Sequence, residues 1–397
     1  MSPMFVHLNI GLKGYDPLQD RQSTPSAMHV QLEAAFRRPK CCPYCQGTHL
    51  LGKGRYQRKV RHLDCFKETT RLIVHTHRFL CGSCGRSFIP KLPGILRGRH
   101  SSEPFREAVY QHHHDGVCTR TLARRKELGQ ATVSRIYHQF TCRKAAERLS
   151  LDCPHYLGID EHTLHKSQRF CTTFCDLKNR RVFDIQPGKS TADLTKFLNK
   201  LKGREHVKVI CIDLSSTYRS LIRRYFPNAR IVADRFHVVR VIQHHFMHLA
   251  RHLAAPLKSH RGNLAALRKA PEKLDERQRK RLDKLFTAHP ILQTLHEEMH
   301  HLRHLMNHKH QTKQQCRELI PRLLGKIRSL KENKAAPLQT LAATLEDWIE
   351  PIVCMWRTTR NNGITEGFHR KMKLIQRRAY GFRNFENYRL RVIAQCG

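Results

Sequence analysis

Two pairs of cysteines near the start of the chain have the spacing of metal-binding knuckles. They are Cys42-Pro-Tyr-Cys45 and Cys81-Gly-Ser-Cys84, and 35 residues separate the two pairs. Four thiolates held in two tight turns supply the tetrahedral set of soft ligands that zinc prefers in closed structural sites. The spacing therefore predicts one structural zinc ion, although four unliganded core cysteines or a redox pair are alternatives. Cys41 and Cys65 lie close by, and the sequence leaves open whether either joins the site.

Three acidic residues stand out in a chain that is otherwise strongly basic. Asp160 and Asp213 each end an apolar stretch typical of a β-strand, and Glu366 opens a predicted helix. Two such aspartates on adjacent strands, with a glutamate from a helix, would form an oxygen-rich site for two Mg²⁺ ions. Paired metal ions of that kind clamp the attacking and leaving oxygens of a phosphodiester displacement. Glu161 is expected to face away from Asp160, because successive strand residues point to opposite faces.

These acids also have a purely structural interpretation. A strand-end aspartate often closes a turn or caps a helix, and Asp213 is followed by serines that suit the same role. A glutamate in the first turn of a helix is favoured by the helix dipole. The catalytic interpretation therefore depends on the three acids acting together.

Two basic segments are suited to binding DNA. The segment from Gly116 to Ile136 has apolar residues at helical spacing and a turn marked by Gly129, a pattern that favours a helix-turn-helix. Its candidate DNA contacts are Arg120, Arg124, Arg125, Thr132, Ser134 and Arg135. The predicted helix after Glu366 adds three candidate contacts to the phosphate backbone, Lys371, Arg377 and Arg378. The spacing around the turn departs from the common form of the motif, so a plain helical hairpin is the alternative.

A further motif, His296-Glu-Glu-Met-His300, matches the HExxH pattern of zinc proteases. The same four-residue spacing of histidines continues to His304 and His308 in a segment rich in charge. With 29 His in the chain, such a motif arises readily by chance. We therefore expect these histidines to line a helix face near DNA or solvent rather than a protease site.

Length and charge limit the class of protein. The chain has 397 residues, with 73 Lys and Arg against 32 Asp and Glu, a net charge of +41 before any His is counted. At roughly 100 to 200 residues per domain, this length suggests two or three domains. A charge this large repels itself in the compact state unless an anionic partner neutralises it, so nucleic acid is the expected partner. A merely solvated basic surface is the weaker alternative.

The sequence also indicates a compartment. The first residues contain no basic stretch followed by a long apolar one, so we expect no secretory signal. No window approaches the roughly 18 uncharged apolar residues of a membrane span. The 15 Cys are odd in number and scattered, which argues against a disulfide framework. The expected compartment is reducing, as the cytoplasm is.

The elements that must position these residues can be predicted from the pattern. Residues 1–100 contain short β-like stretches, and residues 101–150 have a helical pattern. The next block is mixed α/β, because a predicted helix at Ser216–Tyr225 lies between its last two strands. The five predicted strands are His155–Asp160, Phe170–Cys175, Arg181–Ile185, Val207–Asp213 and Arg230–Asp234. Residues 236–360 consist almost entirely of helix formers, and a further helix is predicted near the end of the chain.

Several strings of residues resemble the DDE transposases of bacterial insertion sequences, specifically the ISL3 type. They are Leu157–His162, Ile212–Tyr218, Phe226–Val239, Asn362–Phe368 and Lys373–Phe385. The resemblance extends from the first cysteine knuckle to the C-terminus, roughly nine-tenths of the chain, and its last string is very specific.

The resemblance implies an α/β RNase H-like catalytic core with a long α-helical insertion, preceded by a small zinc-binding module and a helix-turn-helix. On this basis a zinc-binding module occupies residues 1–100 and a helix-turn-helix DNA-binding domain occupies residues 101–150. The first part of the catalytic domain is expected at 151–240, the helical insertion at 241–350, and the C-terminal part with the third acid at 351–397.

The resemblance also implies a reaction. Asp160, Asp213 and Glu366 would hold two Mg²⁺ or Mn²⁺ ions that cleave DNA at terminal inverted repeats and join the freed end to target DNA. His237, in the string Asp234-x-x-His237, would stand behind the metal ligands. The expected partners are double-stranded DNA and further copies of the chain, as a homodimer or higher oligomer in a bacterial cytoplasm. The rivals are a zinc and helix-turn-helix regulator without catalysis, and an RNase H-type nuclease without strand transfer.

Overall fold

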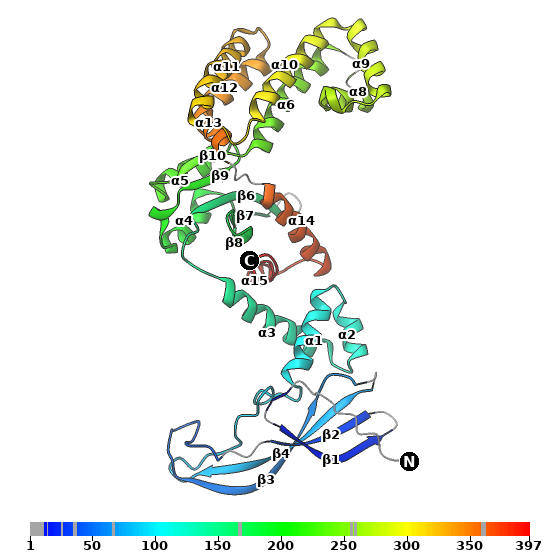
Figure 1. The fold of residues 1–397 in the computed structure, drawn as a ribbon, viewed down its shortest axis with the longest axis vertical. Helices are drawn as coiled ribbons and strands as arrows, with labels where there is room; N and C mark the ends of the chain where they lie inside the picture. The colour runs from blue at the N-terminus through cyan, green and yellow to red at the C-terminus, as the bar shows by residue number, and fades with distance from the viewer. Residues whose placement is uncertain are drawn as a thin grey trace. The chain divides into compact units, whose positions relative to one another are not determined.

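In the computed structural model, the chain is built around two β-sheets, one in each of two units (Figure 1). The units are Met1–Arg143 and Lys144–Gly397. The structure describes residues 12–13, 15–24, 27–34, 38–65, 68–165, 169–254, 257, 260–358 and 363–397.

The first unit contains a sheet in which a long hairpin is the dominant feature. Its strands are β1 (Tyr15–Thr24), β2 (Ala27–Ala34), β3 (Leu50–Arg61), β4 (Thr70–Cys81) and β5 (Ser87–Phe88). The order is β1-β2-β4-β3, and β5 pairs with β4. Because β3 and β4 are antiparallel and Leu50 lies opposite Cys81, the chain returns after 35 residues to the place where it left the first knuckle. The hairpin therefore explains the length of the spacer between the cysteine pairs.

Three helices follow in the same unit. They are α1 (Glu103–His114), α2 (Thr119–Arg125) and α3 (Gln130–Arg148), the last of which crosses the boundary to the second unit. The Ser102 side chain caps α1 by accepting a hydrogen bond from the backbone N–H of Phe105. Tyr110 of α1 stacks on Tyr137 of α3, with ring centroids 5.2 Å apart, in a core that Leu122 of α2 joins. The helix after the predicted turn begins directly behind Gly129.

The second unit contains a mixed sheet made of the five predicted strands. They are β6 (Tyr156–His165), β7 (Arg169–Asp176), β8 (Arg181–Pro187), β9 (Val209–Ile212) and β10 (Arg230–Ala233). The order is β10-β9-β6-β7-β8; β10, β9 and β6 are parallel, whereas β7 and β8 are antiparallel to their neighbours. One prediction about a strand end was wrong: β6 does not end at Asp160. It continues to His165, because β7 pairs with it as far as Arg169 although the parallel partner β9 has already ended.

The helices that pack against this sheet come partly before and partly after the long insertion in the sequence. Before the insertion come α4 (Thr191–Lys200) and α5 (Ser216–Tyr225), separated by a short 3-10 turn at Arg204–His206, and α5 has the predicted bounds. After the insertion come α14 (Gly363–Arg378), which packs against β6, and α15 (Phe385–Cys396), which packs against β8. Segments about 200 residues apart in the sequence thus share one core.

The insertion is helical in every described part except a 3-10 turn at Pro271–Lys273 and its connecting loops. Its helices are α6 (Arg235–Leu253), α8 (Arg261–Arg268), α9 (Glu276–Ala288), α10 (Pro290–Met306), α11 (Lys313–Glu332), α12 (Ala336–Asp347) and α13 (Ile349–Arg357). Helix α6 starts directly after Asp234 and runs without a break through the expected boundary at residue 240. Among the described helices, none combines the length and apolarity needed to cross a membrane.

The insertion packs in two groups. The second half of α10 with α11, α12 and α13 shares the core of the sheet, whereas α8, α9 and the adjoining ends of α6 and α10 form a separate small core. Arg235 joins the first group to the sheet. Its buried guanidinium donates hydrogen bonds to the carbonyls of Met306, His308 and Met355 at 2.9–3.0 Å. Cations at such helix C-termini are favoured by the helix dipole.

Candidate active site and metal centre

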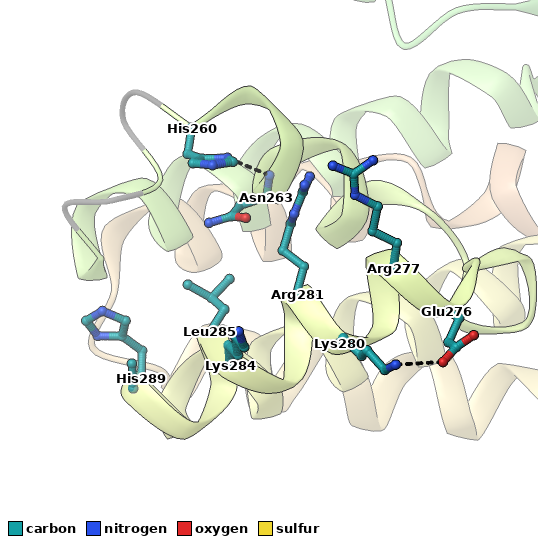
Figure 2. Close-up of a pocket in the computed structure, with 10 residues that line it drawn as sticks. His260, Asn263, Glu276, Arg277, Lys280, Arg281, Lys284, Leu285 and His289 are labelled. Atoms are coloured by element: carbon teal, nitrogen blue, oxygen red, sulfur yellow. Dashed lines mark hydrogen bonds and ion pairs between the residues drawn. The ribbon is translucent and has the colours of Figure 1, made fainter.

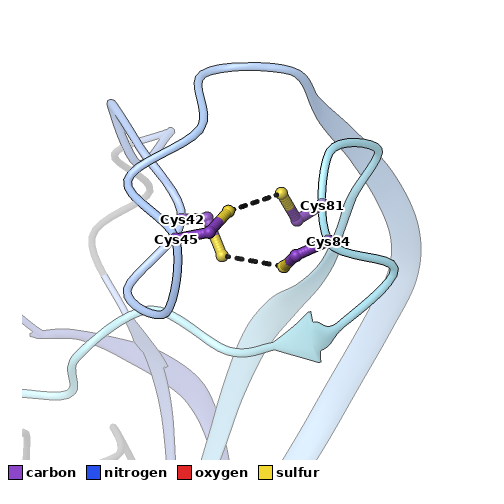
Figure 3. A group of neighbouring side chains, drawn as sticks. All are labelled: Cys42, Cys45, Cys81 and Cys84. Atoms are coloured by element: carbon purple, nitrogen blue, oxygen red, sulfur yellow. Dashed lines mark hydrogen bonds between the residues drawn. The ribbon is translucent and has the colours of Figure 1, made fainter.

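The four cysteines of the two knuckles come together at one end of the β3–β4 hairpin (Figure 3). Their sulfur atoms all lie within 4.8 Å of one another; Cys42 Sγ is 3.7 Å from Cys84 Sγ, and Cys45 Sγ is 3.5 Å from Cys81 Sγ. In the described part of the chain, this is the only group of three or more His, Cys, Asp or Glu gathered so closely. Four sulfurs at this spacing fit a tetrahedral zinc site.

The two knuckles have the same backbone geometry. The N–H of Gln46 donates to the carbonyl of Cys42 at 3.0 Å, and the N–H of Gly85 donates to that of Cys81 at 2.9 Å. Gln46 and Gly85 both follow the second cysteine of their knuckle, and both have a positive φ, of 61° and 67°. Cys41 lies outside the group, since its sulfur is 3.1 Å from Gln46 Oε1. The predicted ligand set is therefore the set that the fold gathers.

In the second unit, three aspartates line up across parallel strands, level with the carboxyl ends of β9 and β10. Asp213 directly follows β9 and Asp234 directly follows β10, and the register pairs Ile212 with Ala233. The register of β6 with β9 pairs Gly158 with Cys211, so Asp160 stands level with Asp213 two residues further on. Asp160 and Asp234 are buried residues, with 9% and 4% of their surface exposed. In the sequence Asp234 stands out only as part of the Asp234-x-x-His237 motif, whereas the register of β10 with β9 adds it to this row.

The aspartates are held in an environment that disfavours their negative charge. Burial raises the pKa of Asp160 to about 6; repulsion from Asp213 and Asp234 adds to this, while a hydrogen bond from the Glu161 N–H and the charge of His237 oppose it. Burial also raises the pKa of Asp213. The Oδ1 atom of Asp213 is buried and has no hydrogen-bond partner within the described structure. Crowded carboxylates with an unpartnered buried oxygen fit the ligand chemistry of a divalent cation.

His237 stands beside this row, in the first turn of α6. Its Nε2 atom is 3.7 Å from Asp234 Oδ2, and Asp234 also caps the helix through the N–H of Phe236. The charge of a protonated His237 lowers the pKa of both Asp160 and Asp213. His237 therefore contacts the row of aspartates through Asp234, which also caps α6.

Glu366 lies in the first turn of α14, the helix that packs against β6. Its side chain is 50% exposed and pairs with Arg370 at 3.0 Å. One turn further along, His369 Nδ1 is 3.8 Å from Asp160 Oδ2, and the charge of Glu366 raises the pKa of that histidine. Helix α14 thus brings Glu366 to the side of β6 that carries Asp160. The three carboxylates are not drawn together as tightly as the four sulfurs are.

Glu161 has different partners from Asp160. Its carboxylate is 3.4 Å from Lys189 Nζ, and its charge raises the pKa of both Asp213 and Tyr218. Asp160 instead contacts His369 of α14. Alternation along β6 therefore separates the contacts of the two neighbours, although Glu161 remains close enough to influence Asp213.

A set of polar side chains behind Asp160 was missed by sequence analysis. His162, Thr173, His369 and Tyr388 come from four different elements and bond to one another. Burial lowers the pKa of His162 to about 3 and that of His369 to about 4, so both rings are neutral at pH 7. A signal was present in the sequence, because His162 is two residues from Asp160 on a strand and His369 is three residues from Glu366 on a helix.

Most of the candidate DNA contacts lie on the surface. Arg120, Arg124, Arg125, Ser134, Arg135, Lys371, Arg377 and Arg378 are exposed, and Thr132 is half-buried. Arg135 donates a hydrogen bond to the Thr132 hydroxyl at 3.1 Å, which holds the two side chains together at the start of α3. Lys371 donates to the backbone carbonyl of Gln395 at 2.6 Å and so also links α14 to α15.

The HExxH histidines lie on α10 in surroundings that differ from the expectation. His296 is buried against Phe286, with ring centroids 5.5 Å apart, so the prediction of a solvent- or DNA-facing stripe was wrong at this position. The helix turns its apolar face inward, and position 296 belongs to that face. Among the described residues, no third His, Cys, Asp or Glu completes a compact metal site with His296 and His300.

A strongly basic groove lies between α8 and α9, two of the helices that form the small core of the insertion (Figure 2). It encloses about 700 Å³. Its lining residues are His260, Asn263, Glu276, Arg277, Lys280, Arg281, Lys284, Leu285, Ala288 and His289. Nothing in the sequence patterns singled out this segment.

Comparison with known proteins yields concordant matches. A family model for ISL3-type DDE proteins, described as "Transposase", matches residues 157–392. A second model, described as "zinc-finger of transposase IS204/IS1001/IS1096/IS1165", matches residues 38–84. The chain is also 30% identical over 355 residues to the "Transposase for insertion sequence element IS1001" of Bordetella parapertussis, an alignment that covers 85% of this chain and 84% of the relative.

Proposed function

This chain belongs to the ISL3-type family of DDE transposases, and on that premise we propose that its two units divide the reaction between recognition of DNA ends and strand chemistry. Membership makes the protein a transposase, an enzyme that cleaves DNA and transfers strands, and it implies divalent metal ions such as Mg²⁺. The zinc-ribbon match and the four close cysteines make Zn²⁺ the structural ion of the first unit. The resemblance drawn from the motifs is thereby confirmed.

The catalytic domain in this proposal is an RNase H-like core interrupted by the helical insertion. Supporting it are the mixed five-stranded sheet, helices packed against β6, β8 and β9, and acids at the carboxyl ends of adjacent parallel strands. The insertion is tolerated because loop-closure entropy grows slowly with length, and because α11 to α13 share the core of the sheet.

Asp160 and Asp213 hold the metal ions in this proposal, and Glu366 completes the site from α14. The observation that carries the assignment is the unpartnered, buried Oδ1 of Asp213 beside an Asp160 whose pKa is raised to about 6. Most buried side-chain oxygens have a hydrogen-bond partner, so this oxygen is available to bind a cation. When bound, a divalent ion supplies charge stabilisation to the reacting phosphodiester. The protein's own part is to hold the carboxylates on two adjacent strands.

The test of this function is strand cleavage of labelled duplex DNA that carries the element's ends, found by sequencing the DNA that flanks the gene. We expect Asp213→Asn to abolish cleavage while binding of the same duplex is kept. Loss of cleavage together with loss of binding would instead favour the regulator without catalysis. Cleavage without any joining to target DNA would favour the nuclease.

End recognition is assigned to the first unit and to the start of α3. Arg135, Ser134 and Thr132 occupy its first two turns, which is where a recognition helix contacts base edges. Replacing Arg135 by Ala is expected to weaken binding to terminal DNA by about 1–3 kcal/mol and binding to a scrambled duplex by much less. An equal loss on both duplexes would assign Arg135 to the phosphate backbone instead. Because two ends must be cut and joined, we further propose that at least two copies act together on DNA.

A further inference from the structure

Four side chains behind Asp160 form a continuous row of polar contacts through the interior of the second unit. The Tyr388 hydroxyl is 2.9 Å from His162 Nε2, and His162 Nδ1 is 3.0 Å from Thr173 Oγ1. The same Thr173 oxygen is 3.2 Å from His369 Nε2, and His369 Nδ1 is 3.8 Å from Asp160 Oδ2. The row therefore starts on α15, passes through β6, β7 and α14, and ends at the carboxylate.

Donor and acceptor chemistry gives the row one direction. An ionised carboxylate only accepts hydrogen bonds, so His369 presents its N–H at Nδ1 toward Asp160. The Nε2 atom of a neutral His369 then accepts from the Thr173 hydroxyl, whose single hydrogen is thereby used. Thr173 must accept from His162 Nδ1, and His162 Nε2 accepts from Tyr388. These contacts fix the tautomers of His162 and His369 and the orientations of the two hydroxyls, as hydrogen bonds commonly do around the ligands of metal sites.

The row is shielded from water and in register with the catalytic strand. Thr173 lies directly opposite Asp160 in the β6–β7 ladder, and both Thr173 and Tyr388 are completely buried. His162 is two residues beyond Asp160 and therefore on the same face of β6. Because Thr173 and Tyr388 are completely buried, water does not compete for their hydroxyls, and their contacts hold the partner side chains in one orientation.

We propose that His369 is a positioning residue: it orients the Asp160 carboxylate and fixes α14, and with it Glu366, against the catalytic strand. The inference rests on the proposed metal-binding role of Asp160 and Glu366. His369 and Glu366 are one turn apart on α14, so a contact that fixes one also limits the movement of the other. The 3.8 Å separation from Asp160 is the loosest contact of the row, and such contacts commonly shorten when substrate is in place.

The test compares two buried threonines that are neighbours on β7. Thr173→Val removes the hydroxyl of the row, whereas Thr172→Val removes an equally buried hydroxyl that bonds the carbonyl of Gly188 at 2.8 Å and the Tyr218 hydroxyl at 3.1 Å. The readouts are Mn²⁺ binding by calorimetry on the full chain without DNA, with Asp160→Asn as the reference for loss of the site, and the Mn²⁺ dependence of end cleavage.

We expect Thr173→Val and His369→Ala to weaken Mn²⁺ binding by roughly 10- to 100-fold. Thr172→Val should leave it unchanged, while Thr173→Ser and His369→Asn, which keep a donor in place, should restore part of it. DNA binding should be unaffected in all variants. Unchanged Mn²⁺ binding in folded His369→Ala, or equal losses in the two threonine variants, would overturn the proposal. Mn²⁺ binding that survives Asp160→Asn would instead refute the metal site itself.

A second observation, independent of the first, concerns the groove between α8 and α9. Arg277, Lys280, Arg281 and Lys284 have the i, i+3, i+4, i+7 spacing of one face of α9. Among the described lining residues, only Glu276, which pairs with Lys280 at 2.7 Å, has the opposite charge. Figure 2 shows Arg277 and Arg281 extending from α9 toward α8. A surface of this kind repels itself unless an anion occupies it.

The packing of Arg281 adds to this repulsion. A Cβ atom at Gly262 would lie 2.1 Å from Arg281 Nη1, so the guanidinium lies directly against the first turn of α8. The N-terminus of a helix carries partial positive charge, and a cation placed there is unfavourable. The arrangement becomes favourable when an anion binds beside the guanidinium and neutralises this positive charge.

We propose that this groove binds the sugar-phosphate backbone of DNA, on the premise that the protein acts on DNA as a transposase. From Arg277 to Lys284 the helix rises about 10 Å, which matches about three phosphates along one strand. The neighbouring residues share the sign of charge: residues 261–288 contain nine Lys and Arg against four Asp and Glu. The contact is made to phosphates and carries no base specificity.

The test replaces Arg277, Lys280 and Lys284 by Ala together in the full chain. The matched control replaces Lys313, Arg317 and Arg328, three exposed cations of α11, so that the change in net charge is the same. The groove variant should lower the slope of log affinity against log salt by roughly two to three, for terminal and scrambled duplexes alike.

The control should change the slope much less. Equal changes in both variants, or an unchanged slope in the groove variant, would overturn the proposal. Retained DNA binding with lost binding of poly-glutamate would assign the groove to an acidic protein segment instead. Failure of the wild-type chain to bind any duplex would refute the proposed function rather than the groove alone.

Discussion

Arg389 of α15 donates two parallel hydrogen bonds to the Asp184 carboxylate of β8, from Nε to Oδ1 at 2.6 Å and from Nη2 to Oδ2 at 2.7 Å. Asp184 is only 1% exposed, and burial raises its pKa while Arg389 opposes that rise. The pair fastens the last helix, which carries the neighbouring Tyr388, to the edge strand of the catalytic sheet.

Breaking this pair from one side is expected to be costly. Arg389→Ala leaves a buried carboxylate without its partner, and the free energy of unfolding should fall by about 3–5 kcal/mol. The double variant Asp184→Leu/Arg389→Leu removes both charges and should lose less than the single variant does. Urea denaturation followed by circular dichroism measures both. A single variant as stable as the wild type would show that the pair does not hold α15.

The zinc site predicts a sharp difference between adjacent cysteines. Cys42→Ser removes one of four ligands, so the purified full chain should lose its zinc, about one ion per chain, and the first unit should lose its cooperative thermal transition. Cys41→Ser changes a thiol that lies outside the group and should keep both the zinc and the transition. Elemental analysis and calorimetry distinguish the two. Zinc lost equally from both variants would contradict the assignment of ligands.

The third acid is tested by two conservative replacements. Glu366→Gln keeps the shape of the side chain but removes the charge that would hold a cation, so cleavage in Mg²⁺ should fall by roughly a hundredfold or more while DNA binding is kept. Glu161→Gln should retain cleavage to within severalfold, because the Glu161 carboxylate pairs with Lys189, whereas Asp160 contacts His369. The measurement is cleavage of a labelled terminal duplex, with affinity determined separately. A dead Glu161→Gln beside an active Glu366→Gln would reverse the assignment.

Asp160 predicts a characteristic pH dependence of stability in the absence of divalent metal. Its pKa in the folded protein is about 6, above the ordinary value of 3.8 for an aspartate, so the folded state holds this proton more tightly than the unfolded state does. Stability is therefore lost as pH rises from about 4 to about 6. Above that range, the ionised Asp160 carboxylate destabilises the folded state by its full amount. Asp160→Asn removes the penalty and should be more stable than the wild type by roughly 1–3 kcal/mol at pH 7.5.

The advantage of Asp160→Asn should shrink toward zero at pH 4, where the wild-type carboxyl is protonated in both states. Added Mg²⁺ at pH 7.5 should stabilise the wild type but not the variant, since only the wild type keeps the full ligand set. Urea midpoints for both proteins at the two pH values test this. A stability difference that is the same at pH 4 and pH 7.5 would show that Asp160 is not destabilised by its charge.

Features that depend on residues close together in the chain were predictable. The CxxC knuckles, the five strands of the second sheet and the helix Ser216–Tyr225 were all anticipated, because spacing and apolar pattern act over a few residues. Asp213 was placed at a strand end for the same reason. The position of Glu366 in the first turn of a helix was likewise predicted from the local sequence.

Tertiary structure decided which distant residues share a site. Register between β9 and β10 sets Asp234 level with Asp213, and the β6–β7 ladder places Thr173 opposite Asp160 and carries β6 on to His165. Packing of α14 on β6 brings His369 to within hydrogen-bonding distance of Thr173, 196 residues away in sequence. The burial of His296 arises in the same way, from the face that α10 turns inward. Local sequence patterns specify which face of a helix or strand is apolar. Only strand pairing and helix packing determine which other helix or strand that face contacts.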